Sequence, residues 1–234
     1  MFGCSTSAVD KAVTPAESYW GLTAEYLKIP IINNCSRPVN SLDAIAHLLI
    51  SMQEQYDWSS DLFLISVPPL ERITVFDDHK DTTYYGYKIE TESWSREQYR
   101  IPYLHGLVGL QNFGNDKKLI LHRDPSWNET QALRTVFLLT NWLDSVKANY
   151  IIHNTSGRNF DKNNQWGPSE FVLPYAINHP RCILFENTYH SINENINRPA
   201  DFDQYKWHGH HGSAGNSYFF EKSLLPTMQK CNLI

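Results

Sequence analysis

Short apolar runs alternate with stretches of helical spacing along the chain, and this alternation constrains the fold more than any other feature of the sequence. The clearest run covers residues 61–67 and stops at Pro68 and Pro69, because proline cannot donate to a central sheet ladder. Similar runs occur at residues 150–153 and 182–185. Strands that alternate with helices form βαβ units. We therefore expect an α/β fold, a three-layer α/β/α sandwich around a parallel sheet of about five strands.

Two further strands are expected near the N-terminus. Residues 1–3 have the character of the last residues of a first strand, and residues 29–33 form a short β-like run. A helix between them is expected to begin at Thr14. Thr14 and Glu17 have the spacing of a capping box, and Pro15 suits the first helical position.

Three later stretches have helical spacing. Ser41 can cap a helix whose apolar face is Leu42, Ile45, Leu48, Leu49 and Met52. Another helix is expected from residue 124 to about residue 147, and a last one over residues 215–229. Residues 77–128 are polar and aromatic with scattered glycine and proline. We expect them to form an insertion of loops and short helices within one domain that spans residues 1–234.

Composition and charge argue against several classes of function. The 234 residues carry a net charge of −5, and no basic run exceeds two residues, so a nucleic-acid partner is not expected. No stretch approaches the ~18 apolar residues of a membrane span. The N-terminus lacks the pattern of a signal peptide, which predicts a cytoplasmic location. The four cysteines lack CxxC spacing, which indicates reduced thiols rather than zinc ligands.

Two short motifs at opposite ends of the chain carry residue types used in nucleophilic catalysis. Ser5 lies in GCSTS, residues 3–7, and two adjacent histidines lie in HGHHGSAGN, residues 208–216. A serine hydroxyl attacks only when a base removes its proton, and a neutral imidazole is the usual base near pH 7. A serine in such a short motif is, taken alone, more often an ordinary hydroxyl in a terminal loop than a nucleophile, and only its pairing with the C-terminal histidine motif and the order of the helices brings the two interpretations level.

These motifs, with the strand of residues 61–67 between them, resemble the SGNH/GDSL hydrolase family. The divergent members found in tailed phages and marine viral sequences are the most similar. The resemblance implies an SGNH-hydrolase or flavodoxin-like fold and a serine ester hydrolase without a cofactor. It implies Ser5 as the nucleophile and one oxyanion donor, and His210, five residues before Gly215, as the general base. The implied substrate is an O-acetyl group on a surface polysaccharide.

The family's acid residue normally lies three residues before the histidine, but Trp207 holds that place here. Asp203, seven residues before His210, is the candidate that orients the imidazole. His211 stands where the family often has proline. Val39 and Asn40 match the loop that supplies a second oxyanion donor.

The strand of residues 61–67 ends in prolines where the family supplies an asparagine donor, so that donor is missing unless Ser66, Arg72 or a loop residue replaces it. Arg72, five residues past the strand, could also bind an anionic substrate or form a surface ion pair, which would contribute little to stability.

These departures leave a second hypothesis open. The chain could keep the fold without the chemistry and serve as a structural or attachment component of a virion, or bind carbohydrate, with other virion proteins or further copies of itself as partners. Three histidines within residues 208–211 also raise the question of a metal. Adjacent side chains in a turn rarely converge on one ion, and no acidic or cysteine partner has ligand spacing, so no metal is expected.

Overall fold

The centre of the molecule is a parallel β-sheet. The structure is a computed structural model that describes residues 1–3, 14–30, 34–36, 41–68, 74–75, 86–88, 93–95, 105–106, 125–155, 175, 178–186, 188–189 and 211–234. The sheet has the order β1–β6–β7, with bounds β1 (Leu62–Val67), β6 (Asn149–Asn154) and β7 (Cys182–Ile183). Both strand pairs are parallel. Mixed helices and strands around a parallel sheet confirm the predicted α/β class.

Segment 1–3 continues this sheet beyond β1. Phe2 forms a parallel bridge with Ile65. Its N–H donates to Leu64 O at 2.9 Å, and its carbonyl oxygen accepts from Ser66 N at 2.8 Å. Phe2 is only 1% exposed and belongs to the main core. The first residues of the chain therefore form an internal position of the sheet.

Segment 34–36 lies beyond segment 1–3, because Cys35 N–H donates to Met1 O at 2.7 Å. The main-chain bonds thus follow the order 34–36, 1–3, β1, β6, β7. Of the strand predicted at residues 29–33, residues 29 and 30 are in no strand, and residues 31–33 lie outside the described residues.

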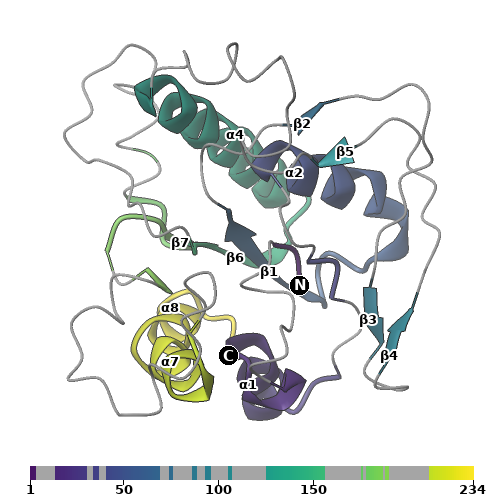
Figure 1. The fold of residues 1–234 in the computed structure, drawn as a ribbon, viewed down its shortest axis with the longest axis vertical. Helices are drawn as coiled ribbons and strands as arrows, with labels where there is room; N and C mark the ends of the chain where they lie inside the picture. The colour runs from purple at the N-terminus through teal and green to yellow at the C-terminus, as the bar shows by residue number, and fades with distance from the viewer. Residues whose placement is uncertain are drawn as a thin grey trace, which may run out of the picture.

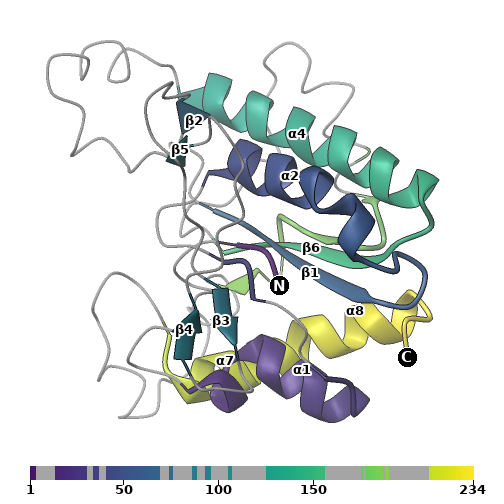
Figure 2. The same ribbon diagram turned by 90° about the vertical axis from the view of Figure 1, so that its right-hand side faces the viewer.

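Helices cover both faces of the sheet, as Figures 1 and 2 show. On one face lie α2 (Leu42–Ser51) and α4 (Pro125–Ser145). On the other lie α1 (Tyr19–Leu27), α7 (Ser213–Phe219) and α8 (Leu225–Lys230). Both faces of β1 and β6 are therefore buried, which explains why these strands read as continuous apolar runs.

Alternating strand residues supply two separate cores. Phe63 and Ile65 of β1 pack with the core of α2 and α4. Leu64 of β1 and Ile151 of β6 pack with the core of α1, α7 and α8. The alternation follows from the pleat, which directs successive side chains to opposite faces.

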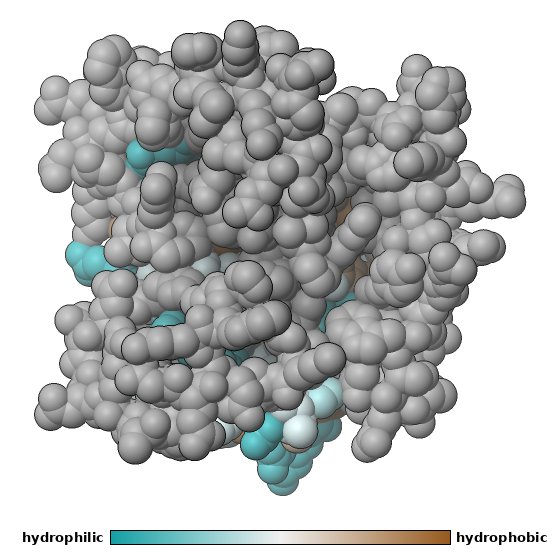
Figure 3. Space-filling model, viewed as in Figure 1, coloured by the Kyte–Doolittle hydropathy of each residue, from teal (hydrophilic) through white to brown (hydrophobic). Residues whose placement is uncertain are grey.

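The predicted start of the first helix is wrong by several residues. The capping box forms as expected, since Glu17 Oε2 accepts from Thr14 N at 2.9 Å. It caps only a 3-10 turn over Pro15–Glu17. Ser18 then adopts an extended conformation and caps α1 itself by accepting from Gly21 N at 3.0 Å. Hydrophilic atoms mark the lower edge of Figure 3, where α1 lies in Figure 1.

Gly21 lets α1 approach the preceding turn closely. A Cβ at this position would lie 1.9 Å from Pro15 O. We expect Gly21→Ala to destabilise the protein by about 1–3 kcal/mol, because the steric clash outweighs the ~1 kcal/mol that alanine gains in a helix. Urea unfolding of the variant measures this difference. Glu25→Ala, at an exposed position of α1, is the control and should stay within about 0.5 kcal/mol; a Gly21→Ala protein as stable as wild type would contradict the prediction.

The other predicted helices are present. α2 and α4 match the expected ranges closely, with α4 ending at Ser145. The predicted C-terminal helix is continuous from Ser213 to Lys230, with a π-helical turn over Phe220–Leu224. Pro226 explains this turn, since it lacks the N–H that would continue the i to i−4 ladder.

The described residues of the predicted insertion include three short strands. β3 (Gly86–Lys88) pairs antiparallel with β4 (Ser93–Ser95), and β5 (His105–Gly106) pairs antiparallel with β2 (Thr74–Val75), which lies just before the insertion. Up to the start of α4, the rest of residues 77–128 lies outside the described residues.

Candidate functional site

The chain reverses its direction across the sheet at segment 1–3. The next described segment of the sheet, 34–36, lies beside segment 1–3. The strand after that, β1, lies on the opposite side of segment 1–3. In open α/β sheets, ligands bind outside the carboxyl ends of the strands at such a reversal. The GCSTS motif begins at Gly3, the last described residue of this segment. The carboxyl edge of the sheet is therefore the candidate functional site.

Most of the site residues predicted from the sequence lie outside the described residues, namely Ser5, Val39, Asn40, Arg72, Asp203 and His210. Their roles stay predictions. Ser5 follows the described Gly3 by two residues, so the bridge at Phe2 fixes the strand from which it departs. His211 is described and half-buried at the start of α7.

His211 packs beside the residues that follow β7. Its ring lies 4.8 Å from the ring of Tyr189. Its carbonyl oxygen accepts from Tyr189 OH at 3.4 Å and from Asn216 Nδ2 at 3.0 Å. The described end of the histidine-rich motif is thereby attached to the chain just past the last strand of the sheet.

An aromatic cluster connects this corner with the sheet. Tyr19, Tyr189 and Phe219 pack mutually, with ring centroids between 5.3 and 5.7 Å apart. His153 of β6 completes the cluster, at 5.0 Å from Tyr19 and 5.3 Å from Phe219. Tyr189 also contacts the ring of His211. The cluster joins α1, β6 and α7 near the carboxyl ends of the strands.

His153 is fully buried, at 0% exposure. Within the described part of the chain, neither of its ring nitrogens has a hydrogen-bond partner. Desolvation by burial lowers the pKa of His153 from 6.5 to about 3, so the imidazole is neutral at physiological pH. Sequence reasoning missed this residue, because a histidine that ends an apolar run carries no motif.

The polar groups at the ends of β1 and β6 are already paired. Ser66 Oγ lies 2.8 Å from Thr155 Oγ1, and Thr155 Oγ1 donates to Val67 O at 3.0 Å. Asn154 Nδ2 donates to Leu184 O at 3.3 Å. Ser66 is also 0% exposed. Its hydroxyl is therefore not available as the substitute oxyanion donor that the sequence left open.

A second group of reactive residue types lies at the opposite, amino end of the strands. His179 Nε2 is 3.3 Å from Asp144 Oδ2, and His179 Nδ1 is 3.6 Å from Cys182 Sγ. Tyr150 OH donates to the same carboxylate at 2.8 Å. The order acid, imidazole, thiol is that of a catalytic triad, and the sequence motifs missed it.

The protonation of the thiol argues against catalysis by this group. Desolvation, followed by the charge of Asp144, raises the pKa of the Cys182 thiol well above its usual range. Desolvation likewise raises the pKa of Tyr150, with its bond to Asp144 as the next cause. Since the thiolate is the nucleophile, a thiol held protonated is inert. The network serves to join the end of α4 to the starts of β6 and β7.

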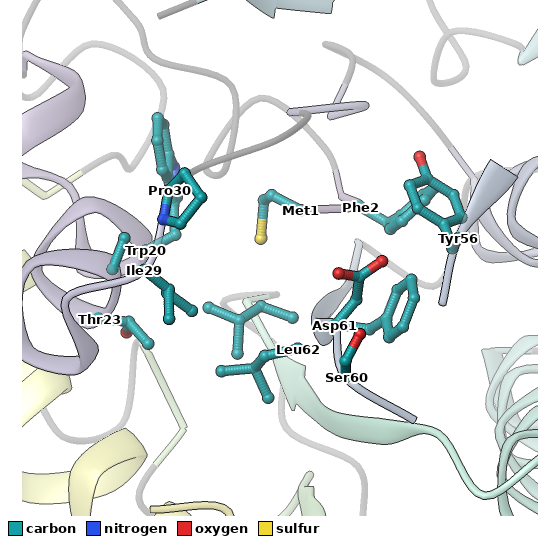
Figure 4. A pocket seen from close by; sticks show the side chains of 13 residues that line it. Met1, Phe2, Trp20, Thr23, Ile29, Pro30, Tyr56, Ser60, Asp61 and Leu62 are labelled. Carbon is teal, nitrogen blue, oxygen red and sulfur yellow. The ribbon is translucent and has the colours of Figure 1, made fainter. Parts of the chain in front are cut away.

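A pocket of about 260 Å³ also lies at the amino end of the strands. Figure 4 shows Trp20, Ile29 and Pro30 on one side of it and Asp61 on the other, with Met1 between them. Its walls are mostly apolar. It is separate from the carboxyl edge of the sheet.

Comparison with known proteins adds no assignment: no family model, curated protein or solved structure matches this chain. Within the described residues, no three histidine, cysteine or acidic side chains are grouped as metal ligands. None of the described helices has the length and apolar character needed to cross a membrane. Function must therefore be argued from the carboxyl edge itself.

Proposed function

We propose that the chain is a serine ester hydrolase of the SGNH type, with its site at the carboxyl edge of the sheet. The observation that carries the proposal is the parallel bridge between Phe2 and Ile65. It makes segment 1–3 an internal strand at the reversal of strand order. Ser5 follows this segment by two residues, and an open α/β sheet binds its ligands outside the carboxyl ends of its strands at such a reversal.

The strand order gives further support. With segments 34–36 and 1–3 added to β1, β6 and β7, five chain segments follow one another across the sheet. The helix α1, between segments 1–3 and 34–36, lies on one face of the sheet, and α2 and α4 lie on the other (Figure 2). We propose that this is the three-layer sandwich of SGNH-hydrolase or flavodoxin-like proteins, with strand order 2-1-3-4-5.

In the proposed reaction, Ser5 Oγ attacks the carbonyl carbon of an ester while His210 accepts the hydroxyl proton. The tetrahedral intermediate collapses, and His210 returns the proton to the departing alkoxide. Water then attacks the acyl-serine by the same route in reverse, releasing the acid and free Ser5. Asp203 orients the imidazole.

The intermediate's oxyanion is stabilised by N–H groups at Ser5 and near Val39 and Asn40. Arg72 and His211 contact the substrate. An O-acetylated polysaccharide is the proposed substrate, in a host-cell cytoplasm or on an assembled virion, without a cofactor, metal, nucleic acid or membrane partner.

The test compares Ser5→Ala with Ser7→Ala, two serines of the same GCSTS motif. We expect the wild type to hydrolyse p-nitrophenyl acetate and diisopropyl fluorophosphate to label Ser5. Ser5→Ala should lose turnover by about 1,000-fold or more, since removing a nucleophile leaves only binding and oxyanion stabilisation. Ser7→Ala should retain turnover. Unchanged turnover in Ser5→Ala would overturn the proposal.

One observation favours the second candidate, a virion structural, attachment or carbohydrate-binding component without catalysis. The end of β1 supplies few hydrogen-bond donors for an oxyanion. The Ser66 hydroxyl is hydrogen-bonded to Thr155, and Pro68 has no N–H. Gel filtration and glycan-array binding beside the esterase assay separate the candidates. A tight oligomer, or a glycan bound intact, without turnover favours the second; a monomer with clear turnover rules against it.

A further inference from the structure

Asn216 of α7 connects two separate parts of the main chain, the start of α1 and the end of the histidine motif just before α7. Its Oδ1 accepts from Tyr19 N, at the start of α1, at 3.1 Å. Its Nδ2 donates to His211 O and to Gly212 O, each at 3.0 Å. The side chain is 3% exposed. Both ends of this buried amide are therefore used, and only an amide can accept and donate in this arrangement.

The carbonyl oxygen of His211 accepts a second hydrogen bond, from Tyr189. Tyr189 OH donates to His211 O at 3.4 Å. The ring of Tyr189 also packs against Tyr19 and Phe219, at 5.7 and 5.3 Å. The peptide between His211 and Gly212 is thus fixed from α7, by Asn216, and from the segment after β7, by Tyr189.

We propose that Asn216 is the positioning residue of the C-terminal histidine motif, with Tyr189 as its helper. This inference rests on the proposed function, in which His210 is the base. Asn216 touches no reacting atom and acts through the main chain at His211, one residue from that base. A displacement of about 1 Å in a catalytic group can lower the rate about 100-fold, so this carbonyl clamp sets the position of the imidazole.

The informative variant is Asn216→Asp, which keeps the shape and the acceptor for Tyr19 N–H. Its carboxylate cannot donate and faces the carbonyl oxygens of His211 and Gly212. We expect kcat for p-nitrophenyl acetate to fall by about 100-fold with KM little changed. The pH at which kcat/KM declines on the acid side should shift, because that decline reports the pKa of the catalytic base. Tyr189→Phe keeps the ring and loses one donor, so a smaller loss in kcat is expected.

The control for general destabilisation is Met228→Ala, a 0% exposed position in α8 of the same C-terminal helix. It should retain kcat and the wild-type pH profile despite its lower stability. Amide hydrogen exchange over residues 208–212 supplies a measurement without turnover. Asn216→Asp should exchange faster there than both wild type and Met228→Ala.

The outcomes separate the two proposals. A wild type with no turnover and no labelling at Ser5 overturns the proposed function, while the exchange measurement still decides whether Asn216 holds the motif. Wild-type turnover with an unchanged kcat and pH profile in Asn216→Asp overturns the positioning role. Equal exchange in Asn216→Asp and Met228→Ala overturns the clamp itself.

Discussion

Replacing Phe2 by alanine is expected to destabilise the protein by about 3–5 kcal/mol, the usual cost of removing a buried phenylalanine. Phe2 is 1% exposed and packs on Tyr56 and Phe63, at ring-centroid distances of 6.1 and 6.5 Å. Domains of this kind are stable by only about 5–15 kcal/mol. The variant should therefore be marginally folded at 37 °C, and urea unfolding followed by circular dichroism measures the loss.

Two comparisons make this result specific. Phe2→Leu keeps most of the apolar volume and the main-chain bridge to β1, so it should recover more than half of the loss. Tyr26→Ala removes an aromatic ring that is 50% exposed and should cost far less. A near-neutral Phe2→Ala would show that segment 1–3 does not form an internal strand in solution, and would remove the main support for a site at Ser5.

Replacing His153 by leucine is expected to change how stability depends on pH. Burial lowers the pKa of His153 in the folded protein from 6.5 to about 3. Between these two values the unfolded chain binds a proton that the folded protein does not, so wild-type stability falls as the pH falls from 6.5. The loss is about 1.4 kcal/mol per pH unit. Above pH 6.5 both states are neutral and this residue adds no pH dependence.

The difference in unfolding free energy between His153→Leu and wild type should therefore shift by about 2 kcal/mol in favour of the variant between pH 7 and pH 5. Ile151→Val, on the same strand and face, is the control, since its cost of about 0.5–1.5 kcal/mol should not vary with pH. Urea unfolding at several pH values measures both. Parallel curves for His153→Leu and wild type would mean that the imidazole is hydrated or paired in solution.

The sequence was most informative where a long periodic pattern was present. α2, α4 and the C-terminal helix follow from apolar spacing over ten or more residues, and β1 follows from an apolar run closed by prolines. The first helix shows that a capping motif alone does not predict where a helix begins. Thr14 and Glu17 do form a capping box, but the extended backbone of Ser18 ends the turn before α1 begins.

The sheet edge and the buried histidines depended on contacts distant in the chain. The sequence indicates a strand end at residues 1–3, but only the pairing of Phe2 with β1 shows that this strand lies inside the sheet. Beyond segment 1–3, the described main-chain bond is made by Cys35, which follows the apolar run of residues 29–33. His153 and His179 lie in no motif, and their environments are created by helices and loops that pack over them.

The bond between Tyr19 and Asn216 joins residues 197 positions apart, and the contact between Ser66 and Thr155 spans 89 positions. Folding therefore depends on distant parts of the chain meeting, which slows it. During synthesis, α1 meets α7 only after the last helix has left the ribosome, and until then Leu64 and Ile151 lack the cover of α7 and α8. Chains that end before the last helix would expose this apolar face and be prone to aggregate.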